Sequence, residues 1–366
     1  MNPGIENALK RFGQSYDIYE YIFDDWEVDD EFKTKFREQL KNGYDRVLSV
    51  NFSPLIAEVC NDMGISYVSW VYDSPMHIRN MEAMKYPVVT IYNFDGGEVL
   101  QLQKQGICAK HLPLAVDVEV FGKTINKNKN NRLYDSEITL LGKLYNTDYN
   151  YYLGPLSEHT KGMLEGILAA QAKVQNAYII PESIPEILLT EMNECYAKAS
   201  NNTVQITRQE LQYMLGCEVT ARERYIILSL LVKHFPVRLY SNEKNVNLKN
   251  VEECGYADYY SQMPCIFHNS KINLNITLRT IRTGIPLRVI DILGCRGLAL
   301  MNMQEEAMEY FAPGEELVMY QDIGDLYEKA AFYLKEDELR KKIVERGYER
   351  VKRDFTFDER VRILLQ

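Results

Sequence analysis

The stretch from 272 to 294, INLNITLRTIRTGIPLRVIDILG, holds polar residues at positions where a ligand could bind. We expect an apolar strand that ends at Thr277, a break at Gly284-Ile285-Pro286 and an amphipathic helix after it. The first turn of a helix offers free backbone N–H groups and the positive end of the helix dipole, which together bind anions. Arg288 falls in that turn, where a cation opposes the dipole, so an anionic ligand such as a diphosphate would explain it.

Asp291 lies three residues after Arg288 and therefore shares a helix face with it. An ionised carboxylate accepts hydrogen bonds from ribose hydroxyls, which suits a position beyond a phosphate site. The same spacing also fits a surface ion pair between Arg288 and Asp291 beside an ordinary turn. Spacing alone leaves both interpretations open.

A second candidate loop follows the predicted strand in SEITLLGKLYN. Gly142 allows the backbone to approach a ligand closely, and Lys143 or Tyr145 could reach a phosphate. The alternative is a simple turn after the strand.

A carboxylate and an imidazole follow another apolar strand, in ISYVSWVYDSPMH. Asp73 ends that strand and His77 comes four residues later, so either side chain could act as a base. Asp95 ends the next apolar strand, IYNFD, in the same way. The alternative is that Asp73 caps the element that follows it.

The sequence TARER is typical of a helix start. Thr220 fits an N-cap and Glu223 would complete a capping box, so we expect a helix to begin there. We give this segment a structural rather than a catalytic role.

The sequence lacks the common motifs for phosphate-binding loops, dinucleotide binding, nucleophilic serines and metal sites. The sequence has no G-x-x-x-x-G-K-[ST], no G-x-G-x-x-G after a strand, no G-x-S-x-G and no D-x-D. Its seven cysteines include no C-x-x-C pair, and neither they nor the five histidines have zinc-ligand spacing. We therefore expect no metal site.

The elements that position these residues alternate between strands and helices, which predicts an α/β fold with mostly parallel sheets. A length of 366 residues suits two domains. The polar segment DVEVFGKTINKNKNNRLY is the best linker candidate. The chain begins with a predicted helix and an extended segment, YDIYEYIF, so the first strand of the first domain is expected to be missing or replaced.

Charge and hydropathy limit the partners. The net charge is −10, which argues against a nucleic-acid surface. Residues 1–20 lack a basic start followed by an apolar core, and no apolar run reaches about 18 residues. We therefore expect a cytoplasmic protein without an integral membrane segment, while its oligomeric state is left open.

The chain resembles the group-1 glycosyltransferases of the spore-maturation CgeB type, whose N-terminal part carries the domain DUF3880. The resemblance covers roughly residues 45–121 and 135–360. Its N-terminal motifs are VNFSPLIAEVCNDMGISYVSWVYDSP and KHLPLAVDVEVF. Its C-terminal motifs are ITLLGKLY, GMLEGILAAQ, VRLYS, HNSKINLNITLRTIRTGIPLRVIDILG and FAPGEELVMYQDIGDLYEKAAFYL.

The resemblance implies a GT-B fold, with two Rossmann-like domains facing across a cleft. The expected domains are an N-terminal acceptor-side domain (1–121), a linker (122–134) and a donor-binding domain with a helical insertion (135–346). A C-terminal helix (347–366) would cross back to the first domain.

The resemblance also implies site residues. Asp291 would hold the ribose of a nucleotide sugar, while Arg288 and the turn at 284–286 would lie beside its diphosphate. Gly142 would belong to the first loop of the donor domain, and Asn242 would lie near the base. One departure from the family pattern is Arg296, which stands where a second glycine is usual.

The expected function is transfer of a sugar from a UDP-, GDP- or TDP-linked donor to a protein, glycan or lipid-linked acceptor, without a metal or other cofactor. Asp73 or His77 would serve as base if the reaction inverts configuration, and a retaining reaction would need no such base. The alternatives are a non-catalytic GT-B scaffold or assembly protein and a GT-B sugar-nucleotide epimerase.

Overall fold

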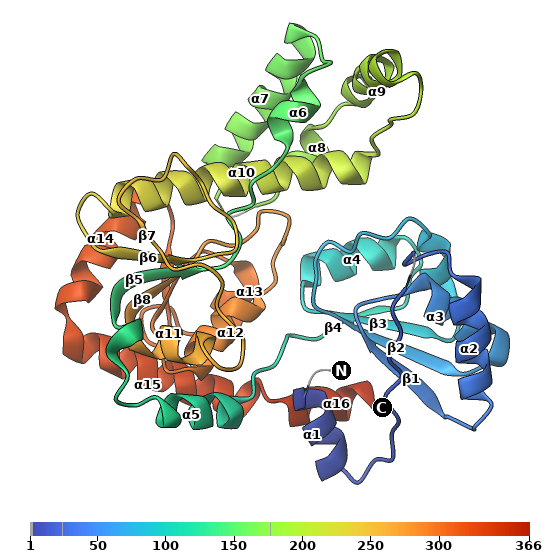
Figure 1. The fold of residues 1–366 in the computed structure, drawn as a ribbon, viewed down its shortest axis with the longest axis horizontal. Helices are drawn as coiled ribbons and strands as arrows, with labels where there is room; N and C mark the ends of the chain where they lie inside the picture. Colours follow the sequence, from blue (N-terminus) through green and yellow to red (C-terminus); the bar gives the residue numbers. More distant parts are fainter. Residues whose placement is uncertain (1–2, 24, 176) are drawn as a thin grey trace. The chain divides into compact units, whose positions relative to one another are not determined.

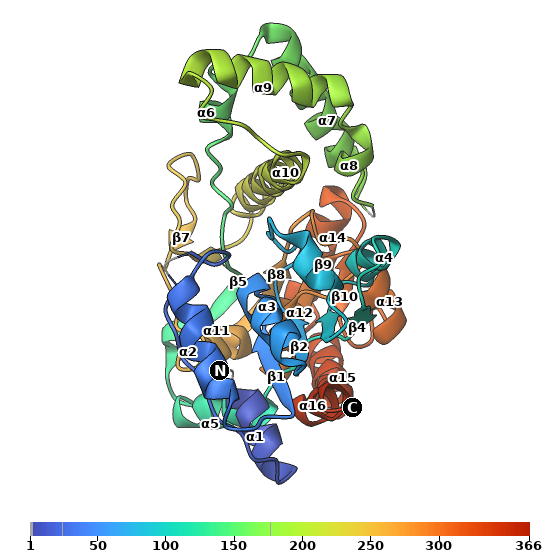
Figure 2. The same cartoon turned by 90° about the vertical axis from the view of Figure 1, so that its right-hand side faces the viewer.

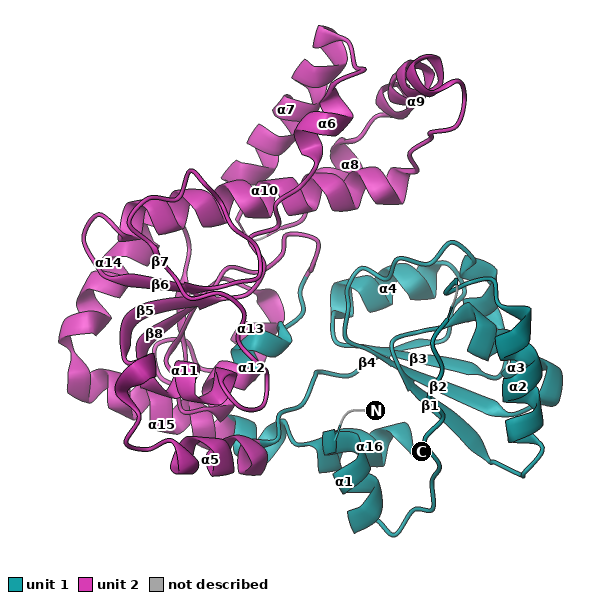
Figure 3. Cartoon of the chain, viewed as in Figure 1, with its two compact units in different colours: residues 1–117, 283–290, 351–366 teal, residues 118–282, 291–350 magenta. Residues whose placement is uncertain are grey.

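The computed structural model describes residues 3–23, 25–175 and 177–366. The chain divides into two compact units, coloured separately in Figure 3. Unit 1 takes residues from 1–117, 283–290 and 351–366, and unit 2 takes 118–282 and 291–350. Segment 283–290 is thus counted in unit 1, although both of its flanks belong to unit 2.

Unit 1 holds a four-stranded parallel sheet in the order β1-β2-β3-β4 (Figure 1). Its elements are α1 (Pro3–Arg11), α2 (Asp30–Leu40), β1 (Arg46–Val50), α3 (Pro54–Met63), β2 (Ser66–Val71), η1 (Met81–Lys85), β3 (Val89–Asn93), α4 (Gly96–Lys104), β4 (Ala109–His111) and α16 (Phe357–Leu364). Strands that follow one another in the sequence are neighbours in this sheet, as the alternating pattern predicts.

Local signals in the sequence explain the helix α3. Ser53 caps it by accepting a hydrogen bond from the backbone N–H of Ile56, and Pro54 occupies its first turn. Gly64 ends it in the left-handed conformation, at φ 69°. Both ends of this helix therefore follow from residues next to it in the sequence.

Residues 16–23, predicted to be extended, join neither sheet. Their aromatic rings pack on α2 instead: Tyr21 lies 5.1 Å from Phe32 between ring centroids, and Tyr19 lies 5.1 Å from Phe36. The first strand of unit 1 is therefore β1, which comes after α2.

The C-terminal segment completes the core of unit 1. The ring of Phe357 in α16 contacts the fully buried Trp70 of β2, with centroids 6.1 Å apart. Arg360 donates to the carbonyl of Pro113 at 2.8 Å, and Arg46 donates to the carbonyl of Leu364 at 2.5 Å. Aromatic packing and hydrogen bonds to backbone therefore hold α16 in this unit.

Unit 2 holds a six-stranded parallel sheet in the order β10-β9-β8-β5-β6-β7. Its strands are β5 (Ser136–Leu141), β6 (Val237–Tyr240), β7 (Glu252–Glu253), β8 (Ser270–Asn275), β9 (Ala299–Asn302) and β10 (Val318–Tyr320). The helices are α5 (Val118–Lys127), η2 (Arg132–Tyr134), α6 (Tyr149–Leu153), α7 (Glu158–Lys173), α8 (Ile180–Ser183), α9 (Glu186–Ser200), α10 (Arg208–Leu231), α11 (Met263–Asn269), α12 (Leu287–Gly294), α13 (Glu305–Tyr310), α14 (Ile323–Lys335) and α15 (Asp337–Asp354). The first residues of α12 and the last residues of α15 are counted in unit 1.

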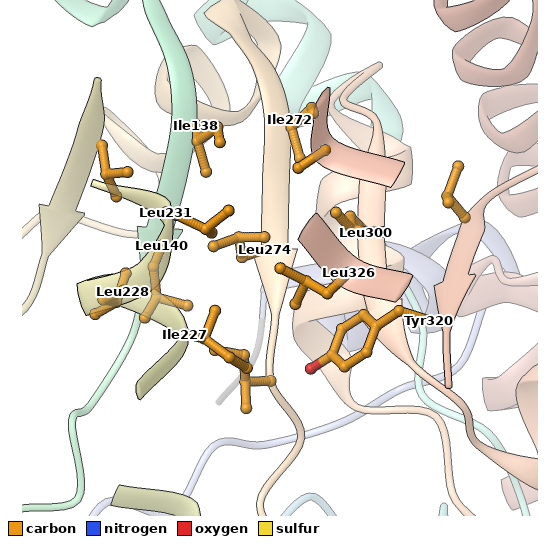
Figure 4. Close-up of a cluster of buried hydrophobic side chains, with 14 of the residues drawn as sticks. Ile138, Leu140, Ile227, Leu228, Leu231, Ile272, Leu274, Leu300, Tyr320 and Leu326 are labelled. Atoms are coloured by element: carbon orange, nitrogen blue, oxygen red, sulfur yellow. The ribbon is translucent and has the colours of Figure 1, made fainter. Parts of the chain in front are cut away.

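The core of unit 2 lies between this sheet and the helices α10 and α14. Side chains of β5 and β8 meet Ile227, Leu228 and Leu231 of α10 there (Figure 4). Leu326 of α14 packs against the same cluster. The helix α10 therefore anchors the helices that precede it in the chain, α6 to α9, to the sheet.

Helices α6 to α9, inserted between β5 and β6, form a second core with the first half of α10. Figures 1 and 2 show them standing away from the sheet of unit 2, with α10 between. The segment 122–134, predicted as linker, holds the end of α5 and all of η2.

The predicted helix start at Thr220 was wrong. The helix α10 begins at Arg208, where Thr207 and Glu210 form the capping box. Thr220 lies inside this helix, and its hydroxyl donates to the carbonyl of Gly216 at 2.8 Å. The sequence TARER resembles a helix start because a capping box and the interior of an amphipathic helix share the same residue types.

We expect the variant Phe357→Ala to lower the free energy of unfolding of unit 1 by about 3–5 kcal/mol, because it leaves a cavity against Trp70. Denaturant titration followed by tryptophan fluorescence measures this, since the other tryptophan, Trp26, is already 67% exposed. Leu100→Ala, at an exposed position of α4 in the same unit, is the matched control and should cost much less. Equal costs for both variants would contradict the packing of α16.

Candidate functional site

The strand order of unit 2 reverses between β5 and β8. From β5 the chain proceeds to β6 and β7 on one side, and from β8 to β9 and β10 on the other. Ligands of open α/β sheets bind outside the carboxyl ends of the strands at such a switch point. The two loops that leave β5 and β8 are those that the sequence marked, around Gly142 and after Thr277.

The loop after β5 has an unusual backbone. Gly142 adopts φ 151°, and Tyr145 is left-handed at φ 58°. The carboxylate of Glu243 accepts a hydrogen bond from the backbone N–H of Leu144 at 2.6 Å, which ties this loop to the end of β6. Lys143, which lies between Gly142 and Leu144, is exposed and therefore accessible to a ligand.

Arg224 of α10 joins the two loops across the switch point. Its guanidinium donates to the carbonyl of Lys143 after β5 and to the carbonyl of Ile276 after β8. It also lies over the ring of Tyr145, 4.8 Å from the centroid, and is 7% exposed. A cation thus lies beneath the crevice where the fold places a ligand.

A buried ion pair fixes the loop after β8. Arg279 and Glu223 of α10 approach to 2.5 Å, and their side chains are only 6% and 7% exposed. The hydroxyl of Thr220 accepts a hydrogen bond from the backbone N–H of Arg279 at 3.0 Å, and the carbonyl of Gln175 accepts one from its guanidinium at 2.6 Å. The helical insertion therefore holds this loop directly.

Glycine is required where α10 meets the same loop. A Cβ atom on Gly216 would lie 2.4 Å from the methyl carbon of Thr280, closer than any side chain tolerates. The sequence placed Glu223 in a capping box at a helix start, so its pairing with Arg279, 56 residues away, was missed.

Thr277 and the asparagines before it form hydrogen bonds at the carboxyl end of β8. Asn302, at the end of β9, accepts a hydrogen bond from the backbone N–H of Thr277 at 2.8 Å. Asn275 donates to the Thr277 hydroxyl at 2.9 Å, and Asn273 donates to the carbonyl of Phe267 at 3.0 Å. These amides set the direction in which the chain leaves β8.

In unit 1, a buried carboxylate holds the start of the segment 283–290. One Asp95 oxygen accepts hydrogen bonds from the backbone N–H and hydroxyl of Thr283, at 3.0 and 3.1 Å, and from the backbone N–H of Gly284 at 3.3 Å. Asp95 also caps α4 through Gly97 and is fully buried. A Cβ atom on Gly284 would lie 2.8 Å from the Asp95 Cα atom, so this turn requires glycine.

The residues after this turn differ in exposure. Ile285 and Pro286 are buried, and Arg288 is partly exposed in the first turn of α12. Asp291, farther along α12, is 1% exposed and accepts a hydrogen bond from the hydroxyl of Tyr259 at 2.8 Å. The ribose and diphosphate roles of Asp291 and Arg288 stay predictions.

Asp73 lies at the carboxyl end of β2 in unit 1 and is exposed. Asn51, left-handed at φ 62° after β1, donates to it at 2.7 Å and accepts from the backbone N–H of Tyr72 at 2.8 Å. His77 is exposed on the loop that follows. Both candidates for a base are therefore open to solvent in unit 1.

Asn242, the predicted contact to the base, is exposed just after β6 in unit 2. Its neighbour Glu243 holds the loop after β5, as described above. Gly142, Lys143, Tyr145, Asn242 and Thr277 thus all lie at the carboxyl edge of one sheet.

We searched the described part of the chain for reactive cysteines, metal sites and membrane-spanning helices. Burial raises the pKa of Cys60 to about 12 and that of Cys217 to about 11, so neither thiol ionises near neutral pH. Among residues 3–23, 25–175 and 177–366, no three His, Cys, Asp or Glu side chains gather as a metal site would need. Within the same ranges, no helix has the length and apolar character to cross a membrane.

The sequence of the C-terminal part matches a known family model. Residues 222–366 match the family described as glycosyl transferase-like. An uncharacterized protein of Aquifex aeolicus is 30% identical over 117 residues, which are 31% of this chain and 29% of that protein's length.

Solved structures share the fold. The Anabaena protein HepE in complex with UDP-glucose matches with a TM-score of 0.52 and 10% identity, over 91% of this chain and 81% of HepE. A glycosyltransferase from Rickettsia africae matches with a TM-score of 0.50 and 11% identity, over 98% of this chain and 86% of that one. The chain therefore has the α/β GT-B fold that the sequence predicted.

We expect Arg279→Met to lower the free energy of unfolding of unit 2 by about 3–5 kcal/mol, because it leaves the carboxylate of Glu223 buried and unpaired. The double variant Glu223→Met/Arg279→Met should recover part of that loss. Urea denaturation followed by circular dichroism measures both. Lys341→Ala, which breaks the exposed pair with Glu338, is the control and should cost less than about 1 kcal/mol. A cost for Arg279→Met as small as that of the control would contradict the buried pair.

We expect Asp95→Asn to weaken the hold on the turn at 283–284, because an amide accepts these hydrogen bonds less strongly than a carboxylate does. Hydrogen-exchange mass spectrometry should show faster exchange in peptides that cover 281–290 than in the wild type. Asp358→Asn, in an exposed contact with Arg11, should leave those peptides unchanged. Unchanged exchange in the Asp95 variant would contradict the contact.

Proposed function

We propose that the chain is a glycosyltransferase that moves a sugar from a nucleoside-diphosphate sugar to the hydroxyl of a protein, glycan or lipid-linked acceptor. The observation that carries the proposal is the switch point of unit 2, where Arg224 joins the loops after β5 and β8. The matched family model begins at residue 222, so it covers Arg224 and the loop after β8. The UDP-glucose in HepE, which has the same fold, supports a donor of this class.

The chemistry follows from charge. A nucleoside diphosphate leaves with extra negative charge, and fixed N–H groups and cations stabilise it most. Lys143 is exposed after β5, and we propose that it and Arg288, with the backbone N–H groups at the N-terminus of α12, neutralise the diphosphate. These cations would replace a divalent metal, so we propose a metal-independent reaction.

The remaining roles are proposals of the same kind. Asp291 would accept hydrogen bonds from the ribose and Asn242 would contact the base. If the reaction inverts configuration, Asp73 or His77 would take the proton of the acceptor hydroxyl, and both are exposed in unit 1. We further propose the CgeB-like, DUF3880-containing subgroup and a cytoplasmic location.

We expect Arg288→Ala to weaken the binding of UDP, GDP or TDP about ten- to a hundredfold, because a charge-assisted hydrogen bond contributes about 1.5–3 kcal/mol. Isothermal titration calorimetry with each diphosphate measures this. Arg296→Ala is the matched control, because Arg296 pairs with Glu345 and Tyr348 at the far end of α12. Unchanged affinity in Arg288→Ala would remove the diphosphate assignment.

Turnover separates the proposed enzyme from its alternatives. A transferase releases nucleoside diphosphate from the matching donor, faster when the acceptor is present. An epimerase would convert the donor without an acceptor, and a scaffold would release nothing from any UDP-, GDP- or TDP-sugar. Either of these results would overturn the proposed transfer.

A further inference from the structure

The segment 16–23, which connects α1 to α2 in unit 1 (Figure 1), alternates its side chains as a β-strand does. Every second ring packs on Phe32 of α2, with centroids 4.7–6.2 Å apart: Tyr19, Tyr21 and Phe23. The residues between them face solvent, since Ile18 is 43% exposed, Ile22 is 92% exposed and Glu20 is exposed as well. Contacts at every second residue indicate an extended chain with one packed face and one open face.

The backbone of this segment is open to a partner. Residues 16–23 belong to neither sheet. Among the described residues, none forms a hydrogen bond with a backbone N–H or carbonyl group of the segment. A peptide can add as a strand to exposed backbone of this kind, and the hydrogen bonds between the two main chains then supply affinity.

Contacts with unit 1 hold the segment in place. The hydroxyl of Tyr21 donates to Asp29, the N-cap of α2, at 3.3 Å. The carboxylate of Asp17 accepts a hydrogen bond from the hydroxyl of Tyr44, which lies just before β1. Because these contacts and the packed rings already order the segment, a strand that adds to it loses less entropy than one that pairs with a flexible loop.

Charge indicates the kind of partner. Residues 16–31 contain eight Asp or Glu and no Lys or Arg. Neighbouring elements pair with three of these carboxylates, since Arg79 meets Asp25 and Glu27, and Lys35 meets Glu31. Glu20 stands apart on the open face, and among the described residues no Lys or Arg forms an ion pair with it. A Lys or Arg on an added strand would therefore find an opposite charge directly across from it.

A second copy of this chain is a poor partner for the same segment. An antiparallel ladder between two copies, centred on Glu20, would place the two Glu20 carboxylates opposite each other. Like charges in such cross-strand positions destabilise a ladder. The apolar side chains at 18 and 22 and the excess of carboxylates together favour a different, basic polypeptide.

We propose that residues 16–23 are a docking strand for an extended, basic segment of another protein. That segment adds beside them and alternates apolar side chains with Lys or Arg. Its apolar side chains contact Ile18 and Ile22, and a basic side chain between them pairs with Glu20. The interaction goes beyond the proposed sugar transfer and does not depend on it.

Synthetic peptides test the docking strand. We expect the labelled lysine peptide KTVTKTVTK, which carries Lys and Val on one face, to bind the wild-type protein in fluorescence anisotropy titrations. Ile22→Ser should bind it about tenfold more weakly, because the variant removes an apolar contact. Glu20→Lys should weaken the lysine peptide and instead favour the glutamate peptide ETVTETVTE. Ile187→Ser, at a 58% exposed position of α9 in unit 2, is the matched control and should change neither affinity.

Backbone pairing has its own readout. We expect the bound lysine peptide to slow hydrogen exchange of the amides in 16–23, and the proline peptide KTVPKTVPK, which keeps the charge but loses backbone donors, to bind much more weakly. The proposal is wrong if the lysine peptide does not bind, or if Ile22→Ser and Glu20→Lys bind it as the wild type does. Equal binding of the proline peptide, or unchanged exchange in 16–23, would also overturn it. Self-association of the wild type that Ile22→Ser abolishes in sedimentation would show a second copy to be the partner instead.

Discussion

The buried pair between Arg279 and Glu223 is the constraint on which the candidate site of unit 2 depends. A charge with this little exposure is tolerated only when it is paired and hydrogen-bonded, and Arg279 meets both conditions through Glu223 and Gln175. Because Glu223 belongs to α10 and Arg279 to the loop after β8, the pair transfers the rigidity of a long helix to a loop. Arg224, the next residue of α10, extends the same support to the loop after β5.

This arrangement means that the helical insertion and α10 hold the loop after β8 in place. Helices α6 to α9 have a core of their own, yet α10 packs on the sheet and reaches the switch point from behind. Loops that bind ligands work best when a rigid element holds them in the binding geometry. The insertion also contributes Gln175, whose carbonyl accepts a hydrogen bond from Arg279, so it supports the loop after β8 directly.

Alternating apolar strands and helices predicted the fold, because patterning and the resemblance agreed, and the GT-B fold was confirmed. The strand ends at Gly142 and Thr277 were found because polar residues after buried strands are conspicuous in a sequence. Glu223, Arg224 and Arg279 were missed because their partners lie about 50 to 80 residues away, a distance over which local patterns carry no information. Asp95 was noticed as a strand end, but its contact with Thr283 needed the folded chain.

The most direct test of this account is a crystal structure of the protein with a bound nucleoside diphosphate. The account predicts that the diphosphate lies outside the carboxyl ends of β5 and β8, within hydrogen-bond distance of the loop at Gly142 and Lys143, with Arg224 beneath it. A diphosphate bound elsewhere on the chain, with the switch point of unit 2 left to solvent, would contradict the account.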